Sequence, residues 1–350
     1  MNRYFACREG GWTENLCTGK NFREIKQIWS IFRLVRLPNL VIIAATQYAM
    51  RYLIVAPLLP SDSFALQLDD LHFGLLVLST IFIAAAGYII NDYFDTRADM
   101  INKPERVVVG LKIGRRMAMA LHAVFNIIGV GIGVYLSFYI GMPTLSIVFF
   151  LAAGLLWFYS TNYKRQFLVG NLSVAFLTGL VPLMVVLFEI PLLNRAYGEI
   201  MIRHEANFTY IFAWVGGFSF FAFLTTLLRE IIKDTEDFEG DMAYGMKTVP
   251  IVLGIFWTKV VVVALISFTL FMLVFILTEY IFFSVPGNDY ISLIYFTVLL
   301  IIPLIVLLVM VITAKNKKDF HRASMMIKWI MLTGILYSGV VFYLVQFRYG

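Results

Sequence analysis

The residues with the clearest chemical potential are acidic side chains that follow an apolar stretch. They lie in the segment NDYFDTRAD, directly after the apolar run FIAAAGYII. If a helix continues through this segment, Asn91, Asp95 and Asp99 recur every four residues on one face, and Asp92 lies one residue round the turn. Crowded carboxylates repel one another and take up protons unless a cation binds among them. A ligand set made only of oxygen atoms favours Mg²⁺, which completes its shell with water and substrate phosphate.

A second acidic group lies in the segment REIIKDTEDFEGD, which also follows a long apolar run. The spacing of Glu230, Asp234, Asp237 and Asp241 predicts that they share one helical face. Two acidic faces that converge across a cavity could hold a pyrophosphate through bridging Mg²⁺ ions, which neutralise the leaving group. The alternative, acids that are merely solvated in loops, is more plausible for one group alone than for two groups with this spacing.

Basic residues in the same loops are candidates for direct contact with phosphate oxygens. They are Arg106, Lys164, Arg229 and Lys233. For Lys164 the competing interpretation is a positive residue that only flanks a membrane helix.

The elements that must position these groups are membrane helices. The chain has 350 residues and is 60% hydrophobic and 14% charged, which is too apolar for an ordinary soluble domain. Apolar blocks of about 20 residues alternate with short polar gaps, so the sequence predicts an all-α, polytopic membrane protein with about nine transmembrane helices. The expected spans are 38–56, 73–91, 115–138, 143–160, 168–188, 208–231, 250–278, 290–313 and 325–346.

The distribution of Lys and Arg predicts the orientation. These residues are concentrated in the N-terminal segment and in the loops after the second, fourth, sixth and eighth spans, which the positive-inside rule places in the cytoplasm together with both acidic groups. The opposite side keeps only Arg51, Arg195, Arg203 and Arg348. The net charge of +6 therefore reflects topology and contact with anionic lipid headgroups, with no reason to expect a nucleic-acid partner. We expect an integral, multi-pass protein of the cell (inner) membrane.

The sequence divides into a cytoplasmic N-terminal segment, 1–36, and a transmembrane domain, 37–350. The N-terminal segment lacks the apolar core of a cleavable signal peptide. Its second half, FREIKQIWSIFRLVRL, predicts an amphipathic helix on the inner membrane surface, whereas residues 1–20 are as compatible with a frayed tail. Cys7 and Cys17 lie in this cytoplasmic segment, where no disulfide is expected, and we assign no metal to the scattered histidines.

Several of these motifs resemble those of the UbiA superfamily of intramembrane prenyltransferases. NDxxDxxxD after the second span and DxxxD after the sixth are similar to the paired Asp motifs of that family. YSTNYKR after the fourth span is similar to its YSxxxKR, and RLPN and GN open the first and fifth spans. The resemblance implies a ring of helices around a lipid-open cavity. There a polyprenyl diphosphate would bind through Mg²⁺ and lose pyrophosphate, giving an allylic cation that an acceptor traps.

The resemblance also implies a role for individual positions. One Mg²⁺ would be bound by Asn91, Asp92, Asp95 and Asp99, and a second by Asp237 and Asp241 with Asp234 as an additional candidate. Lys164 and Arg229 would clamp the diphosphate. The expected catalytic residues are Lys164, Arg229, Asp95 and Asp237.

Further substrate contacts are expected from Asn39, Arg106, Asn171 and Lys233. Asn39 could instead cap a helix or form an interhelical hydrogen bond. The ring of Tyr159 could stabilise the cation, although an aromatic residue near the cavity is more often packing.

The acceptor is less sharply defined than the donor. NDYFDTRADMINKPER and REIIKDTEDFEGD are most similar to the archaeal-type geranylgeranylglyceryl phosphate geranylgeranyltransferases, which implies a geranylgeranyl donor and a glycerol ether phosphate acceptor. The sequence departs from that group in RVVVG, 106–110, where two prolines are absent, so an aromatic quinone precursor of the menaquinone type stays open as the acceptor.

Two alternatives come from other classes of protein. A multispan transporter would more often carry charges near the midplane of the membrane. A CDP-alcohol phosphotransferase would need a DGxxAR motif, which the chain lacks.

Overall fold

The computed structural model describes residues 29–59, 64–102, 107–203, 207–282 and 289–349. Within these ranges the regular structure is helical, and extended backbone pairs only in an isolated bridge between Val109 and Ile113. The α-helices are α2 (Leu37–Ala49), α3 (Asp70–Asn102), α4 (Arg115–Tyr139), α5 (Ser146–Thr161), α6 (Val169–Arg203), α7 (Thr209–Glu236), α8 (Phe238–Ala243), α9 (Val249–Ile276), α10 (Tyr290–Tyr295), α11 (Ile302–Thr313) and α12 (Lys317–Leu344). The all-α prediction is confirmed.

Shorter helical segments extend several of these helices. The π-helical segments Met50–Val55, Leu277–Phe282 and Val345–Tyr349 continue α2, α9 and α12, and Phe296–Ile301 joins α10 to α11. The 3₁₀ turns Pro143–Leu145 and Tyr163–Arg165 flank α5.

Eight helices in the described ranges are long and apolar enough to cross a membrane. They correspond to the second to ninth predicted spans, so the prediction of a polytopic membrane protein is confirmed. The first predicted span, 38–56, is also helical, from Leu37 to Val55, but it carries the polar residues Gln47 and Arg51, both buried. The predicted count of nine is therefore approximate.

The fifth predicted span, 168–188, is too short. The helix α6 runs for 35 residues and contains Pro182 and Pro191. A proline removes one backbone donor and normally disfavours a helix interior, yet neighbouring helices stabilise such positions in membrane proteins. Because the residues after 188 are less apolar and include Pro191, the sequence pattern alone ended this helix early.

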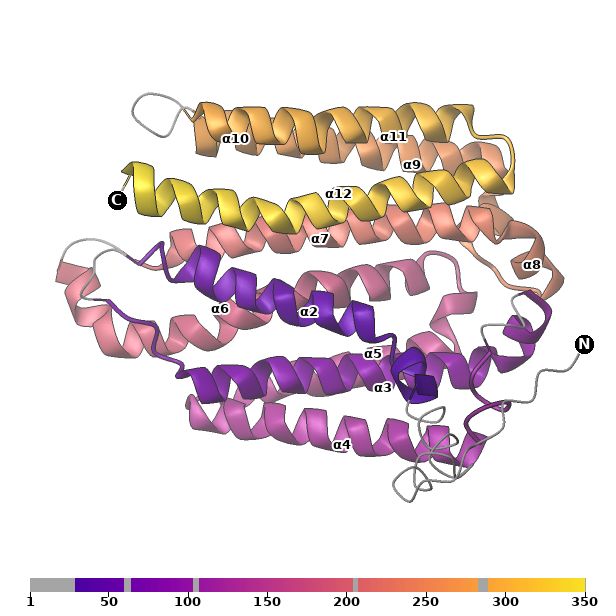
Figure 1. The fold of residues 1–350 in the computed structure, drawn as a ribbon, viewed down its shortest axis with the longest axis horizontal. Coiled ribbons are helices and arrows are strands. Elements are labelled where there is room, and N and C mark those ends of the chain that lie inside the picture. Colours follow the sequence, from indigo (N-terminus) through magenta and orange to yellow (C-terminus); the bar gives the residue numbers. More distant parts are fainter. Residues whose placement is uncertain (1–28, 60–63, 103–106, 204–206, 283–288, 350) are drawn as a thin grey trace, which may run out of the picture.

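The helices lie side by side along the long axis of the molecule (Figure 1). Helix α3 packs against α4, α6 packs against α7, and α7 also contacts α9 and α12. The C-terminal end of α3 and the short helix α8 lie at the same end of this bundle, on the right in Figure 1. The bundle therefore brings the two acidic segments to one end.

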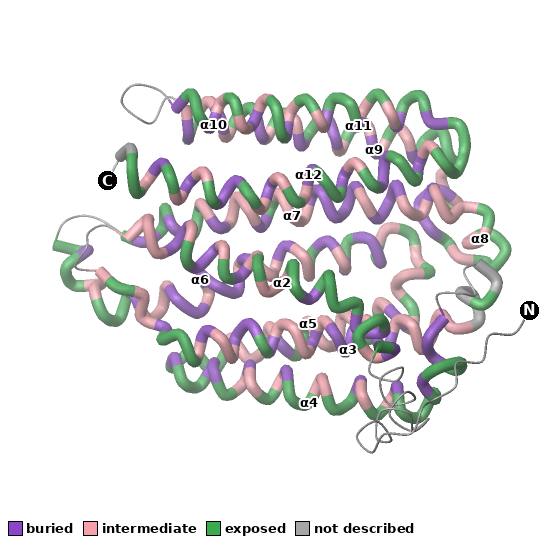
Figure 2. Tube along the Cα trace, viewed as in Figure 1, coloured by how far each residue is buried: buried purple, intermediate pink, exposed green. Residues whose placement is uncertain are grey.

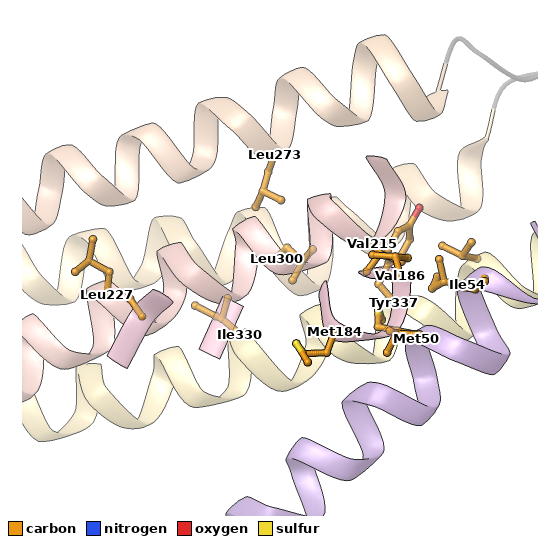
Figure 3. Packing of buried hydrophobic residues seen from close by; sticks show 14 of the residues in the cluster. Met50, Ile54, Met184, Val186, Val215, Leu227, Leu273, Leu300, Ile330 and Tyr337 are labelled. Carbon is orange, nitrogen blue, oxygen red and sulfur yellow. The ribbon is translucent and has the colours of Figure 1, made fainter. Parts of the chain in front are cut away.

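Burial follows the expected arrangement of a membrane protein. Buried positions gather where helices face each other, and many positions on α4, α10 and α11 are exposed (Figure 2). Large apolar side chains on the outside, such as Phe256 and Trp257, are 70% and 60% exposed. Apolar surface on this scale is stable only in contact with lipid or a partner. Inside, Met50, Val215 and Tyr337 pack together from different helices (Figure 3).

Candidate active site

The first acidic group lies on the last turns of α3. The helix continues to Asn102, so Asn91, Asp92 and Asp95 share one helix as their spacing predicts. Asp99 belongs to the same helix, but its side chain lies outside the described part of the structure. Both described carboxylates are paired with cations from other elements: Arg36 Nη2 lies 2.9 Å from Asp92 Oδ1, and Lys164 Nζ donates to Asp95 Oδ1.

Arg36 is a site residue that was recognised in the sequence only as the first residue of RLPN, without a role of its own. It precedes α2 in a left-handed backbone conformation, with φ of 52°, which is uncommon for a residue with a side chain. Its guanidinium carbon lies 5.0 Å from the centre of the Tyr88 ring, while Asn39 donates to the Tyr88 hydroxyl at 3.4 Å. The RLPN segment thus connects α2 to the acidic end of α3. The interhelical hydrogen bond considered for Asn39 is present.

Lys164 is positioned by a close contact between the 3₁₀ turn after α5 and the start of α6. At Gly170 an added Cβ would lie 2.8 Å from Lys164 Cα and 2.9 Å from the Tyr163 carbonyl oxygen, so only glycine permits this approach. The next residue, Asn171, is buried and donates through Nδ2 to Asp234 Oδ2 at 2.8 Å. The pair Gly170 and Asn171 therefore positions two residues that were predicted to contact the substrate, Lys164 and Asn171.

The second acidic group does not form the single continuous helical face that its spacing predicts. Helix α7 ends at Glu236, and Asp237 adopts the non-helical φ of −93° and ψ of 11° before α8 begins. Because the helix is interrupted at Asp237, Asp241 belongs to a separate short helix. The expected face holds only within α7, where Glu230 and Asp234 lie one turn apart.

The remaining contacts of this group come from several elements. Arg229 pairs with the neighbouring Glu230 at 2.5 Å, and Lys317 Nζ of α12 lies 3.9 Å from Asp237 Oδ1. Burial raises the pKa of Asp241 to about 6, and the like charges of Asp237 and Asp95 act in the same direction. Since Asp95 belongs to α3, the two acidic groups lie within electrostatic range of each other.

Tyr159, near the end of α5, lies within electrostatic range of both groups. It interacts electrostatically with Asp95 on α3, with Glu230 and Asp234 on α7, and with Arg36. Groups from four parts of the chain thus converge at one end of the bundle.

Two further residues of this end are contributed by α12. Lys317 contacts Asp237 as described, and His321 Nδ1 lies 2.9 Å from Glu236 Oε1. In the sequence, these two residues were marked only by lying in the cationic loop between the last two spans, which was predicted to be on the same side of the membrane as the acidic groups.

Lys233 lies in the last turn of α7, where its charge acts on Asp234 and Asp241. Arg106 lies outside the described residues.

The donors available to a cation are carboxylate and amide oxygens, the kind of ligand that Mg²⁺ prefers. Among the side chains that the structure describes, no three acidic, histidine or cysteine groups are close enough to form a metal site. The acids present fit Mg²⁺ in chemical type, and Asp92 and Asp95 are held by Arg36 and Lys164.

These features define the class of protein: it is a multi-helix membrane protein in which acidic and basic groups face one another at one end of the bundle. The family model described as the UbiA prenyltransferase family matches residues 53–332, and the chain belongs to this family. The family resemblance seen in the sequence motifs is confirmed.

Curated relatives carry a more specific name. The digeranylgeranylglyceryl phosphate synthase of Methanothermobacter thermautotrophicus is 36% identical over 185 residues, which are 52% of this chain and 57% of that protein. The synthase of the same name from Sulfurisphaera tokodaii is 34% identical over 241 residues, 67% of this chain and 75% of that protein. The match therefore spans little more than half the length of the first relative.

Solved structures show the same fold. A digeranylgeranylglyceryl phosphate synthase structure is similar with a TM-score of 0.62 at 23% identity, covering 90% of this chain and 99% of that one. A UbiA homolog from Archaeoglobus fulgidus, bound to DMAPP and Mg²⁺, is similar with a TM-score of 0.52 at 15% identity, covering 89% of this chain and 99% of that one.

Proposed function

We propose that the protein transfers a polyprenyl group, of geranylgeranyl type, from its diphosphate to a glycerol ether phosphate acceptor in the membrane, releasing pyrophosphate. The observation that carries this proposal is the convergence of Asp95, Asp234 and Asp241 with Lys164 at one end of an apolar bundle. The basic residues of that end, together with Mg²⁺ held by its acids, match the negatively charged diphosphate of the donor. The apolar interior matches the isoprenoid tail. Relatives named digeranylgeranylglyceryl phosphate synthase support the choice of acceptor.

Residues on both acidic segments would hold Mg²⁺, with two ions as the proposed number. Asp92 and Asp95 would be ligands on one side, and Asp237 and Asp241 on the other. The additional ligand candidates are Asn91, Asp99 and Asp234. When bound, Mg²⁺ supplies positive charge that neutralises the departing pyrophosphate.

The protein's own cations bind and orient the diphosphate. Lys164 and Arg229 both lie at this end and would donate to its oxygens, with Lys233 and Arg106 as further candidates. The bond between the first prenyl carbon and the diphosphate oxygen breaks, and its electron pair leaves with pyrophosphate. A hydroxyl oxygen of the acceptor then bonds to the allylic carbon, and its proton passes to a carboxylate or to the pyrophosphate.

The proposed setting is the cell membrane, with the acidic end and the N-terminus in the cytoplasm. The distribution of Lys and Arg supports this orientation, because cationic loops resist translocation. With Cys7 and Cys17 replaced by serine, reaction of single introduced cysteines with a membrane-impermeant thiol reagent in intact cells tests it: labelling of the loop after α8 from outside would contradict the orientation.

The experiment that tests the function is transfer of labelled geranylgeranyl diphosphate by the purified protein in lipid nanodiscs. Three acceptors are offered separately: geranylgeranylglyceryl phosphate, 1,4-dihydroxy-2-naphthoate and 4-hydroxybenzoate, each with Mg²⁺ or with EDTA. We expect product with the glyceryl phosphate only, and none with EDTA. Product with an aromatic acceptor alone would replace the acceptor class. A protein that neither forms product nor binds the diphosphate with Mg²⁺ would not be a prenyltransferase, and the transporter alternative would return.

A further inference from the structure

An apolar cavity lies on the side of the bundle away from the acidic end. It has a volume of about 370 Å³ and is lined by α7, α9, α12 and the π-helical segments that follow α9 and α10. Leu273, Leu300 and Tyr337, which Figure 3 shows on three different helices, are buried in its wall. Tyr210 and Tyr280 at its edge are 38% and 66% exposed, so the cavity opens toward the lipid side.

The cavity offers little to a polar ligand. The hydroxyl of Thr269 donates to the carbonyl oxygen of Leu265 at 2.8 Å, and that of Tyr210 donates to Leu58 O. The Tyr337 hydroxyl is 2.8 Å from Ser292 Oγ. Because these polar atoms already have partners within the protein, the cavity suits an apolar occupant of ligand size.

A smaller cavity, of about 100 Å³, lies between this space and the acidic end. It is lined by α2, α6, α7 and α12. Its wall begins at Ile42, about one helical turn beyond Asn39, and at Thr178, about two turns beyond Asn171. The smaller cavity thus begins one to two helical turns from the polar residues Asn39 and Asn171.

The two cavities share one wall, formed by Phe218, Phe221 and Gly334. At Gly334 an added Cβ would lie 2.2 Å from Cε1 of the Phe221 ring, so the ring rests directly on the glycine backbone. The partition between the cavities is therefore about one side chain thick at this point. A chain that passes from one cavity to the other at this point would have to displace the Phe221 ring.

The distances along α7 match the length of an isoprenoid chain. At about 1.5 Å per residue, Thr225 lies roughly 14 Å from Asp234 along the helix, and Phe221 about 20 Å. An extended chain advances about 1.2 Å per bond, as a polypeptide advances about 3.5 Å over three bonds, so each four-bond isoprenoid unit adds about 5 Å. Mg²⁺ and the diphosphate would lie between Asp234 and the first prenyl carbon and add roughly 5 Å, since each Mg–O distance alone is about 2 Å. Two units, about 10 Å, then end near the level of Thr225, whereas the last of four units, about 20 Å in all, lies between the levels of Phe221 and Gly217.

We propose that the cavity between α7, α9 and α12 receives the terminal isoprenoid unit of the donor chain, and that Phe221 on Gly334 separates it from the active site and so sets the preferred chain length. The proposal rests on the proposed prenyl transfer. It assigns chain-length selection to residues far from the acids. Phe221 and Gly334 would determine specificity without contacting the reacting atoms.

A pair of neighbouring glycines supplies the test. Gly217 lines the large cavity and Gly216 lines neither cavity, and an added Cβ at either position meets nothing within 4 Å. Gly217→Leu places a side chain in the large cavity and reduces its volume, while Gly216→Leu makes the same change in backbone preference one residue away. For each variant, kcat/KM is measured with geranylgeranyl diphosphate and with geranyl diphosphate, using one acceptor in nanodiscs.

We expect Gly217→Leu to lower the ratio of the two kcat/KM values about tenfold, which corresponds to about 1.4 kcal/mol. Gly216→Leu should leave the ratio at the wild-type value. An unchanged ratio in Gly217→Leu would overturn the proposal. That result is expected if a membrane lipid or the acceptor's chain, and not the donor's chain, fills the cavity. If Gly217→Leu fails to fold, Phe221→Leu decides: opening the partition should raise the ratio, and no rise would refute the assignment. A wild-type protein that transfers neither chain would instead refute the proposed function.

Discussion

The buried ion pair between Arg51 and Glu189 makes a quantitative prediction about stability. Both residues are 1% exposed, and the pair joins the first membrane helix to α6 with 2.9 Å between Arg51 Nη1 and Glu189 Oε2. The other oxygen of Glu189 accepts from the backbone N–H groups of Gln67 and Leu68, at 2.5 and 3.1 Å. One carboxylate therefore holds the chain segment before α3 against two helices.

Glu189→Gln removes the charge but keeps the shape of the side chain. The amide oxygen can still accept from Gln67 and Leu68, but the amide nitrogen faces the donors of Arg51. Arg51 keeps Asp70, at 3.3 Å, but that carboxylate is 83% exposed and compensates weakly. Because breaking a buried pair leaves an uncompensated charge, we expect a loss of about 3–5 kcal/mol in the free energy of unfolding.

The assay is unfolding in mixed micelles by added SDS, followed by far-UV circular dichroism. Asp69→Asn is the matched control, since Asp69 pairs with His72 at 2.5 Å but is 50% exposed, and its loss should change the free energy by about 0–1 kcal/mol. The double variant Arg51→Met with Glu189→Gln should be more stable than Glu189→Gln alone, because no charge is left buried and the amide oxygen can still accept from Gln67 and Leu68. Equal, small losses in Glu189→Gln and Asp69→Asn would refute the reasoning.

The remaining predictions concern the acidic end and the packing of α4. Asp95→Asn or Asp237→Asn should reduce Mg²⁺-dependent transfer more than about 100-fold while the circular dichroism spectrum is retained, because even indirect changes around a metal lower activity about 10–100-fold; near wild-type activity would contradict the site. Lys164→Met should lower kcat/KM by about 100-fold, as expected when one donor to a developing anion is removed, and retained activity would exclude Lys164 from the diphosphate clamp. Gly133→Ala should destabilise the fold by about 1–3 kcal/mol, because its Cβ would lie 2.4 Å from the Phe149 ring. Gly131→Ala, whose Cβ meets nothing within 4 Å, should be neutral or slightly stabilising in the same unfolding assay.

The sequence predicted those features that depend on local order along the chain. Apolar blocks located the membrane helices because a span must satisfy its backbone internally and present apolar side chains to lipid. The spacing of Asn91, Asp92 and Asp95 predicted a shared helix because the helical period fixes which residues lie on one side. The motif resemblance led to the correct family for the same reason, since its residues are close together in the chain.

Features that depend on contacts between distant segments were not predictable in the same way. The pairing of Arg36 with Asp92 requires the relative placement of two helices, which periodicity does not determine. The interruption at Asp237 was missed because the acidic spacing remains compatible with a continuous helix, whereas the backbone there is not helical. Likewise, Arg51 appeared as one of few cations on its side of the membrane, and only the fold revealed Glu189 as its buried partner.

The close contact at Gly170 restricts how this active site can change. Lys164, which pairs with Asp95, and Asn171, which bonds Asp234, are both located by the same backbone approach. Any side chain at position 170 would push the two segments apart and disturb both pairs together. Selection, natural or in the laboratory, therefore cannot adjust one of these contacts through this position without altering the other, and variation that changes substrate preference must arise elsewhere in the bundle.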